Sequence, residues 1–130
     1  MNKLVKEAWV ARLRSGDYKQ GEGQLFDGER HCCLGVLCEL YKDTKGGKWS
    51  EPDVEDVKIG DPRFFMEEEG ILPEKVRKWA GLDRQDPVVE LETDQGVRMV
   101  SLSELNDGSV MTNGKRAGFK SIAKIIEKKL

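Results

Sequence analysis

Apolar side chains recur at helical spacing near both ends of the chain. Residues 4–13 carry one such stripe, and Gly16 is placed to end the helix in a left-handed cap. A second stripe runs over residues 119–130 and predicts a C-terminal helix. Trp9 and Phe119 lie on these stripes, and we assign both to the hydrophobic core.

The segment 33–41 differs from the terminal helices because it is apolar on nearly every face, with Glu39 as the exception. A helix that is apolar all round is expected to be a buried, central helix. Gly35 lies inside it, where glycine costs about 1 kcal/mol relative to alanine. We therefore expect another stretch of backbone to approach this helix closely at Gly35.

Two shorter helices are predicted from the residues at their ends. Pro73 suits the first position of a helix, and Gly81 suits its end, so a helix is expected between them with Trp79 on its core face. Ser101 and Glu104 have the spacing of a capping box, which predicts the start of another short helix.

Strand signals come in local pairs. Residues 24–32 are predicted to form a hairpin around Asp27-Gly28, a dipeptide that tolerates the positive φ of a tight turn. Residues 88–100 are predicted to form a second hairpin with its turn at 94–96. No alternation of strand, helix and strand suggests a parallel sheet.

The stretch 43–63 is the least regular and is expected to be loop-rich or variable. Its apolar residues Val54, Val57 and Ile59 predict one short strand. Together these elements predict an α+β fold: one small compact domain over residues 1–130, with four or five helices and two short antiparallel β-hairpins.

Composition places the chain among globular proteins, because 38% of its 130 residues are hydrophobic and 35% are charged. With 22 basic and 24 acidic residues it lacks a strongly basic nucleic-acid coat. No apolar run approaches the ~20 residues of a membrane span, and no signal peptide opens the chain. Residues 51–70 hold eight acids and two bases (net -6), whereas residues 115–130 hold six bases and one acid (net +5).

A sulfur-rich cluster is formed by Cys32, Cys33, Cys38 and the single histidine, His31. The odd number of cysteines indicates reduced thiols rather than a disulfide framework. A zinc site and a Cys–His nucleophile are two alternatives, but the first lacks a second ligand pair and the second lacks a histidine across a cleft. We expect the thiols to pack as small apolar groups, and we expect no metal or cofactor.

Aromatic and fork-like polar side chains lie in predicted loops and at the ends of elements. Such groups bind nucleotides, since bases stack on aromatic rings and arginine grips phosphate. The candidate ligand-binding residues are Tyr18, Gln20, Arg30, His31, Trp49, Arg63, Phe65, Asn106 and Asp107. No catalytic constellation is evident, which favours a binding protein over an enzyme. The alternative is a regulator that contacts DNA or a protein through basic terminal helices, if those helices pack together.

Several strings resemble a family of small proteins from tailed bacteriophages and prophages, and the resemblance is weakest between about 42 and 70. The most specific string runs from Cys32 to Cys38 (CCLGVLC); others are Leu13-Arg14-Ser15-Gly16, Trp79-Ala80-Gly81-Leu82 and Leu105-Asn106-Asp107. The resemblance implies a phage accessory protein in the host bacterial cytoplasm. Small proteins of this kind include homo-oligomers that sequester nucleotide signals of antiviral immunity, and others that bind host proteins. No catalytic role transfers to any residue.

Overall fold

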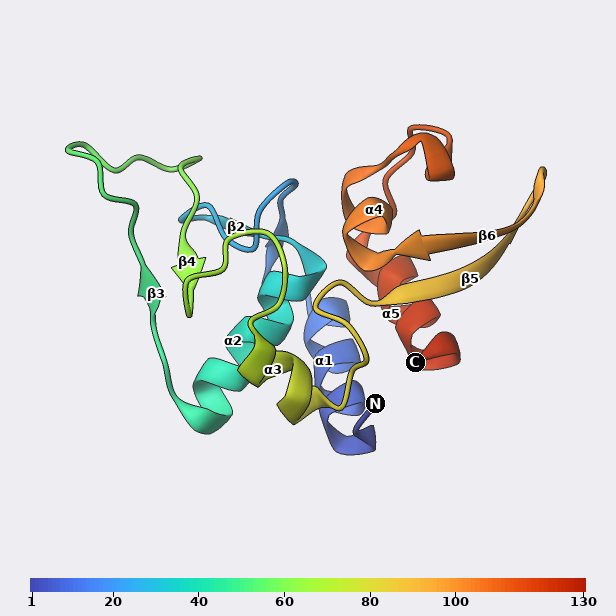
Figure 1. The fold of residues 1–130 in the computed structure, drawn as a ribbon, viewed down its shortest axis with the longest axis horizontal. Coiled ribbons are helices and arrows are strands. Elements are labelled where there is room, and N and C mark those ends of the chain that lie inside the picture. Colours follow the sequence, from blue (N-terminus) through green and yellow to red (C-terminus); the bar gives the residue numbers. More distant parts are fainter.

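A computed structural model describes all residues, 1–130 (Figure 1). The helices and strands follow one another in this order: α1 Lys3–Arg14, β1 Lys19–Gln20, β2 Arg30–His31, α2 Cys33–Lys45, β3 Trp49–Ser50, β4 Phe64–Phe65, α3 Glu74–Ala80, β5 Val88–Thr93, β6 Gly96–Ser101, α4 Leu102–Asp107, the single-turn 3₁₀ helix η1 Val110–Thr112, and α5 Phe119–Lys129. The five α-helices and the short two-stranded sheets confirm the predicted α+β class. No helix has both the length and the apolar character needed to cross a bilayer.

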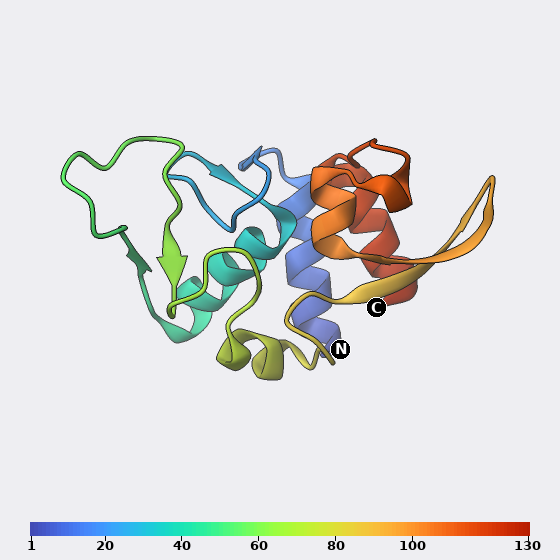
Figure 2. The same cartoon turned by 45° about the horizontal axis from the view of Figure 1, so that its top comes forward.

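The terminal helices pack against each other, as Figures 1 and 2 show, and α2 lies against the other side of α1. The apolar stripe of α5 is buried at Phe119, Ile122 and Ile126, because it faces α1 and α4. An ion pair between Arg14 and Glu127, at 3.0 Å, also joins α1 to α5. The condition that the basic terminal helices pack together is therefore met.

Helix α2 is the buried central helix that the sequence predicts. All six residues from Cys33 to Cys38 are buried, including Gly35. A Cβ atom at Gly35 would lie 1.9 Å from the carbonyl oxygen of Leu25, so the expected close approach of backbone is confirmed. The helix continues to Lys45, four residues beyond the predicted apolar segment, and ends at Gly46 with φ 97°.

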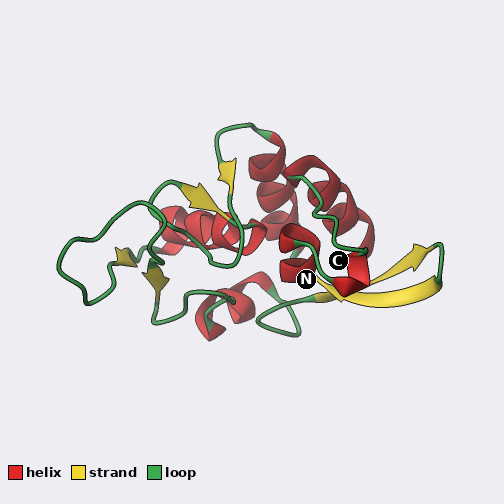
Figure 3. Ribbon diagram, turned by 90° about the horizontal axis from the view of Figure 1, so that it is seen from above, coloured by secondary structure: helices red, strands yellow, loops and turns green.

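The strands form three separate pairs (Figure 3). The predicted hairpin over 88–100 is confirmed, with β5 and β6 antiparallel and Val89 opposite Val100. The segment 24–32 forms a tight turn, but only one antiparallel bridge, between Phe26 and His31, instead of a hairpin. The neighbouring pair of β1 and β2 is parallel, contrary to expectation, and only two residues long.

The prediction of a short strand at Val54, Val57 and Ile59 is wrong. These residues lie outside any strand, and the pair that brackets them is β3 with β4, where Trp49 lies opposite Phe65. Ile59 is 67% exposed, so the apolar pattern that suggested a strand has no partner within the chain. A strand needs a neighbouring strand to satisfy its backbone, and residues 51–59 have none, whereas Gly60 and Arg63 donate to the backbone carbonyls of Asp27 and Phe26.

We predict that Gly35→Ala destabilises the protein by about 1–3 kcal/mol or more, because its methyl group would overlap the Leu25 carbonyl. Urea unfolding measures the loss. Gly70→Ala is the matched control: its Cβ would lie 4.0 Å from the nearest atom, the Gly23 oxygen, and its effect should stay within about 0.5 kcal/mol. Equal stability of the two variants would contradict this account of the α2 contact.

Candidate functional site

Four aromatic side chains from separate segments meet beside the middle of α2. The rings of Phe26 and His31 stack with their centroids 4.3 Å apart, and Tyr18 meets the same imidazole edge-on at 5.3 Å. Trp49, from β3, lies 5.1 Å from Phe26 and 6.0 Å from His31. We call Tyr18, Phe26, His31 and Trp49 the aromatic cluster.

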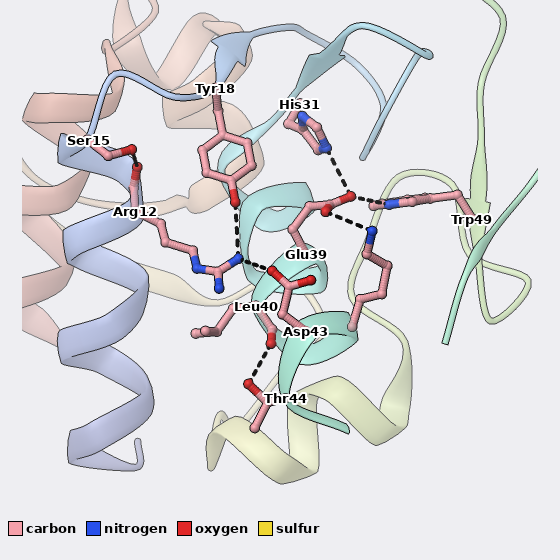
Figure 4. Close-up of polar contacts among 10 residues, drawn as sticks. Arg12, Ser15, Tyr18, His31, Glu39, Leu40, Asp43, Thr44 and Trp49 are labelled. Carbon is pink, nitrogen blue, oxygen red and sulfur yellow. Dashed lines mark hydrogen bonds and ion pairs between the residues drawn. The ribbon is translucent and has the colours of Figure 1, made fainter. Parts of the chain in front are cut away.

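A carboxylate from α2, Glu39, holds the cluster together (Figure 4). One of its oxygens lies 3.4 Å from Nε2 of His31 and also accepts a hydrogen bond from the indole N–H of Trp49. The other oxygen lies 3.3 Å from the ammonium of Lys42. Burial by itself would raise the pKa of Glu39, but the hydrogen bonds from His31 and Trp49 and the nearby positive charge outweigh it and lower the pKa to about 2.

The second nitrogen of His31, Nδ1, is buried and has no hydrogen-bond partner. His31 as a whole is 8% exposed. Polar atoms this deeply buried are normally hydrogen-bonded, because leaving one unpaired costs about 1–3 kcal/mol. Nδ1 of His31 is therefore the one buried side-chain polar atom in the aromatic cluster that lacks a hydrogen-bond partner.

A second polar group lies on the side of the cluster that faces α1 (Figure 4). The guanidinium of Arg12 donates to the hydroxyl of Tyr18 at 3.1 Å and pairs with Asp43 at 2.7 Å. Asp43 and Glu39 come from the same helix, so α2 positions both ends of the arrangement. The ring of Tyr18 is thus fixed by Arg12 on one side and by His31 on the other.

Three of the predicted ligand-binding residues, Gln20, Asn106 and Asp107, hydrogen-bond to one another and to nearby backbone. Asn106 is fully buried; its side-chain oxygen accepts from the backbone N–H of Cys33, at the start of α2, at 3.1 Å, and its amide donates to Gly21 O at 2.7 Å. Gln20 donates to the same Asn106 oxygen, and Asp107 accepts from the Asn106 amide. All these polar groups are used within the fold.

The remaining predicted residues surround or support the cluster. Phe65 is fully buried and packs against Trp49. Arg30 is exposed beside His31 on β2. Arg63 donates to the carbonyl of Asp61 at 2.6 Å, and its guanidinium lies against Gly28 in the turn that follows Phe26. Of the nine predicted residues, Tyr18, His31 and Trp49 converge directly.

Sequence reasoning missed Phe26, Glu39 and Lys42 as members of the site. One signal was available, because Glu39 is the single acid in an otherwise apolar segment of α2. A carboxylate in a buried helix requires charged or hydrogen-bonding partners. Which residues supply them depends on the loops that carry His31 and Trp49, and sequence spacing does not show this.

The three cysteines are buried and form no disulfide. Burial raises the pKa of Cys32 to about 12, and it raises the pKa values of Cys33 and Cys38 well above their ordinary range. No group of three or more His, Cys, Asp or Glu side chains is arranged to hold a metal ion. The thiols therefore pack as small apolar side chains, because a cysteine nucleophile needs an accessible thiolate.

A family model, described as a domain of unknown function (DUF8296), matches residues 1–130, the whole chain. The chain belongs to this family. No curated protein and no solved structure matches it. For this DUF8296 protein, any functional argument therefore rests on its own residues, above all on the aromatic cluster and Glu39.

We predict that the charge of Glu39 stabilises the fold. Because its pKa in the folded protein is about 2, below the ordinary 4.5, the stabilisation is complete above the ordinary value and is lost as the pH falls toward 2. Glu39→Gln should cost about 2–3 kcal/mol near neutral pH. The difference in unfolding free energy between Glu39→Gln and the native protein should shrink as the pH falls below the ordinary pKa of 4.5. Denaturant unfolding across this range measures it.

Glu7→Gln provides the control, because Glu7 is exposed and forms no ion pair. Its stability should follow that of the native protein at every pH. If the difference between Glu39→Gln and the native protein is the same in acid as at neutral pH, the carboxylate of Glu39 does not hold the cluster.

We also predict that iodoacetamide leaves all three cysteines unmodified in the native protein at neutral pH, and that it labels all three in denaturant. Their burial and raised pKa values suppress the reactive thiolate. Mass spectrometry counts the adducts. Ser50→Cys, at an exposed position, should be labelled in the folded state and shows that the reagent is active. Rapid native labelling of Cys32, Cys33 or Cys38 would contradict the packing role.

Proposed function

We propose that this protein binds and sequesters a small nucleotide-type signal, as a phage accessory protein that counters antiviral defence in the host bacterial cytoplasm. One observation carries the proposal: the buried Nδ1 of His31 has no partner although aromatic rings surround it. A ligand edge that hydrogen-bonds to this atom removes a cost of about 1–3 kcal/mol.

The surroundings of His31 favour a planar base. Phe26 and Trp49 are half-buried, so each presents part of a ring on which a base can stack, a contact worth about 1–3 kcal/mol. Phe26 is carried by a turn and Trp49 by β3, a strand of two residues. The polar edge of the base then faces His31.

The charges nearby favour a phosphate-bearing ligand. Arg63 lies at the turn beside Phe26, and Arg30 precedes His31 on β2, with its side chain on the exposed face of that strand. Arginine binds phosphate oxygens in pairs. The carboxylate of Glu39 does not oppose an anion strongly, since Lys42 compensates its charge at 3.3 Å.

Sequestration requires affinity and no chemistry. A dissociation constant of about 1 µM corresponds to about -8 kcal/mol, which two stacked rings and two phosphate contacts can supply. The phage setting is supported by the resemblance of the CCLGVLC string and its companions to small phage proteins. The family match assigns no activity.

Binding of DNA or of a host protein through the basic terminal helices is the second candidate. The packing of α1 against α5 favours it, because it gathers their lysines on neighbouring helices. Two of the basic residues of α1 are already engaged, however: Arg12 pairs with Asp43 and Arg14 with Glu127. The cationic surface is correspondingly reduced, and we therefore favour the small ligand.

We predict that one or more members of a panel of cyclic dinucleotides and ADP-ribose-type nucleotides raises the melting temperature of the native protein. A ligand at 100 times its dissociation constant adds about 2.7 kcal/mol, a shift of several degrees. Trp49→Leu and Arg30→Gln should each lower the affinity for the ligand at least tenfold, because they remove a stacking surface and a phosphate contact. The shift in melting temperature should be smaller for both variants.

The matched controls are Trp79→Leu and Arg84→Gln, which alter another half-buried indole and another exposed guanidinium outside the aromatic cluster. Both should bind as the native protein does. The nucleotide recovered after heating should be chemically unchanged; an altered nucleotide would indicate an enzyme. The proposal fails if no nucleotide shifts the melting temperature. A salt-sensitive gel shift with DNA would then favour the terminal helices.

A further inference from the structure

Two features at opposite ends of the molecule lack a partner within the chain. One is the acidic segment 53–59, in the loop between β3 and β4. The other is the outer edge of β5, next to a hollow of about 450 Å³ between this strand and α5. In Figures 1 and 2 the loop extends from one end of the molecule, and the tip of the β5–β6 hairpin extends from the other.

The segment 53–59 has the pattern of a strand but pairs with nothing. Val54 is 57% exposed and Ile59 is 67% exposed. Over residues 51–57, the single backbone hydrogen bond runs from the N–H of Val54 to the carbonyl of Pro52. The backbone of Lys58 bonds only locally, to Asp61 and Arg63. Exposed apolar side chains beside an unpaired backbone are what an added strand would offer to a sheet edge.

The hollow beside β5 presents complementary chemistry. Its apolar lining includes Leu91 and Ile125, and its basic residues are Lys124, Lys128 and Lys129, all from α5. Strand β5 pairs only with β6, so its other edge has no neighbouring strand. The hollow thus combines an open strand edge with apolar and positively charged side chains.

The side chains of the segment match this hollow when it is extended. Alternate residues of a strand share a face, which places Asp53, Glu55, Val57 and Ile59 together. The two acids suit the lysines of α5, and the two apolar residues suit Leu91 and Ile125. Lys58, on the opposite face, offers a counterpart to Glu90 and Glu92, the acids of β5 that also line the hollow.

We propose that residues 53–59 of one copy of this chain add as a strand to the β5 edge of a second copy, in the hollow between β5 and α5. The two surfaces lie at opposite ends, so one chain cannot pair with itself. The contact is head-to-tail, and such contacts produce rings or open chains of copies. The inference does not depend on the ligand proposed above.

Light scattering coupled to size-exclusion chromatography tests the association. The mass of the native protein should rise from 14.7 kDa to two or more times that value as its concentration increases. High salt should lower the mass again, because the contact between the lysines and the acids is screened at a Debye length of about 3 Å near 1 M. A mass of one chain at every concentration overturns the proposal.

Mixing two variants separates the two halves of the contact. Lys124→Glu with Lys128→Glu alters the hollow, and Val57→Asp with Ile59→Asp alters the segment; each double variant alone should remain monomeric. A mixture should form a 1:1 dimer and nothing larger, because one intact hollow then meets one intact segment. Retained self-association of either variant, or no dimer on mixing, overturns the proposal.

The control variant Val110→Asp with Lys115→Glu alters an apolar residue that is 87% exposed and a basic residue outside the hollow, and should associate as the native protein does. Hydrogen exchange of the native protein provides a measurement that needs no variant. Backbone amides of 53–59 and of β5 should gain protection together as the concentration rises. Protection of neither segment in an associated sample would place the interface elsewhere and contradict the proposal.

Discussion

The contact between the Leu25 carbonyl and Gly35 brings a surface loop against the backbone of a buried helix. Any side chain at Gly35 would hold the two apart, since even a Cβ would lie 1.9 Å from that oxygen. The loop that this contact holds carries Phe26 and His31. The rest of the aromatic cluster is arranged around these two rings, so the absence of one side chain on α2 determines the position of the candidate site.

Burial of α2 imposes a second demand, because its polar groups must find partners inside the protein. At its start, Cys32 provides no side-chain cap, and Asn106 of α4 accepts the N–H of Cys33 instead. Farther along, Glu39 is satisfied by His31, Trp49 and Lys42. Side chains from other elements, together with Lys42 on α2 itself, thus provide what a solvent-facing helix would obtain from water. The same demand explains why the irregular segments on either side of α2 follow defined paths.

The elements with strong local signals were predictable. The capping box of Ser101 and Glu104 is present, and Gly81 closes α3 in the left-handed conformation. Prediction failed where a strand depends on a distant partner. Val54 and Ile59 are residue types common in strands, but no other strand lies beside them. For the site, the types of residue were predictable and their grouping was not. The sequence offers Asn106 and Trp49 equally as candidate ligand-binding residues. In the structure Asn106 is buried in the core, and Trp49 belongs to the aromatic cluster.

The sequence by itself determined the α+β class, the buried character of α2 and the close approach at Gly35, because periodicity, capping residues and glycine act over a few neighbouring positions. Only the tertiary structure decided that Glu39 meets His31 and Trp49, that Nδ1 of His31 is left unpaired, and that the acidic loop and the β5 edge lie at opposite ends. These outcomes depend on how loops of 10 or more residues return to the core, as between Ser50 and Phe64. Side-chain partners across such distances are selected by packing and by the satisfaction of buried charge, which no local pattern records.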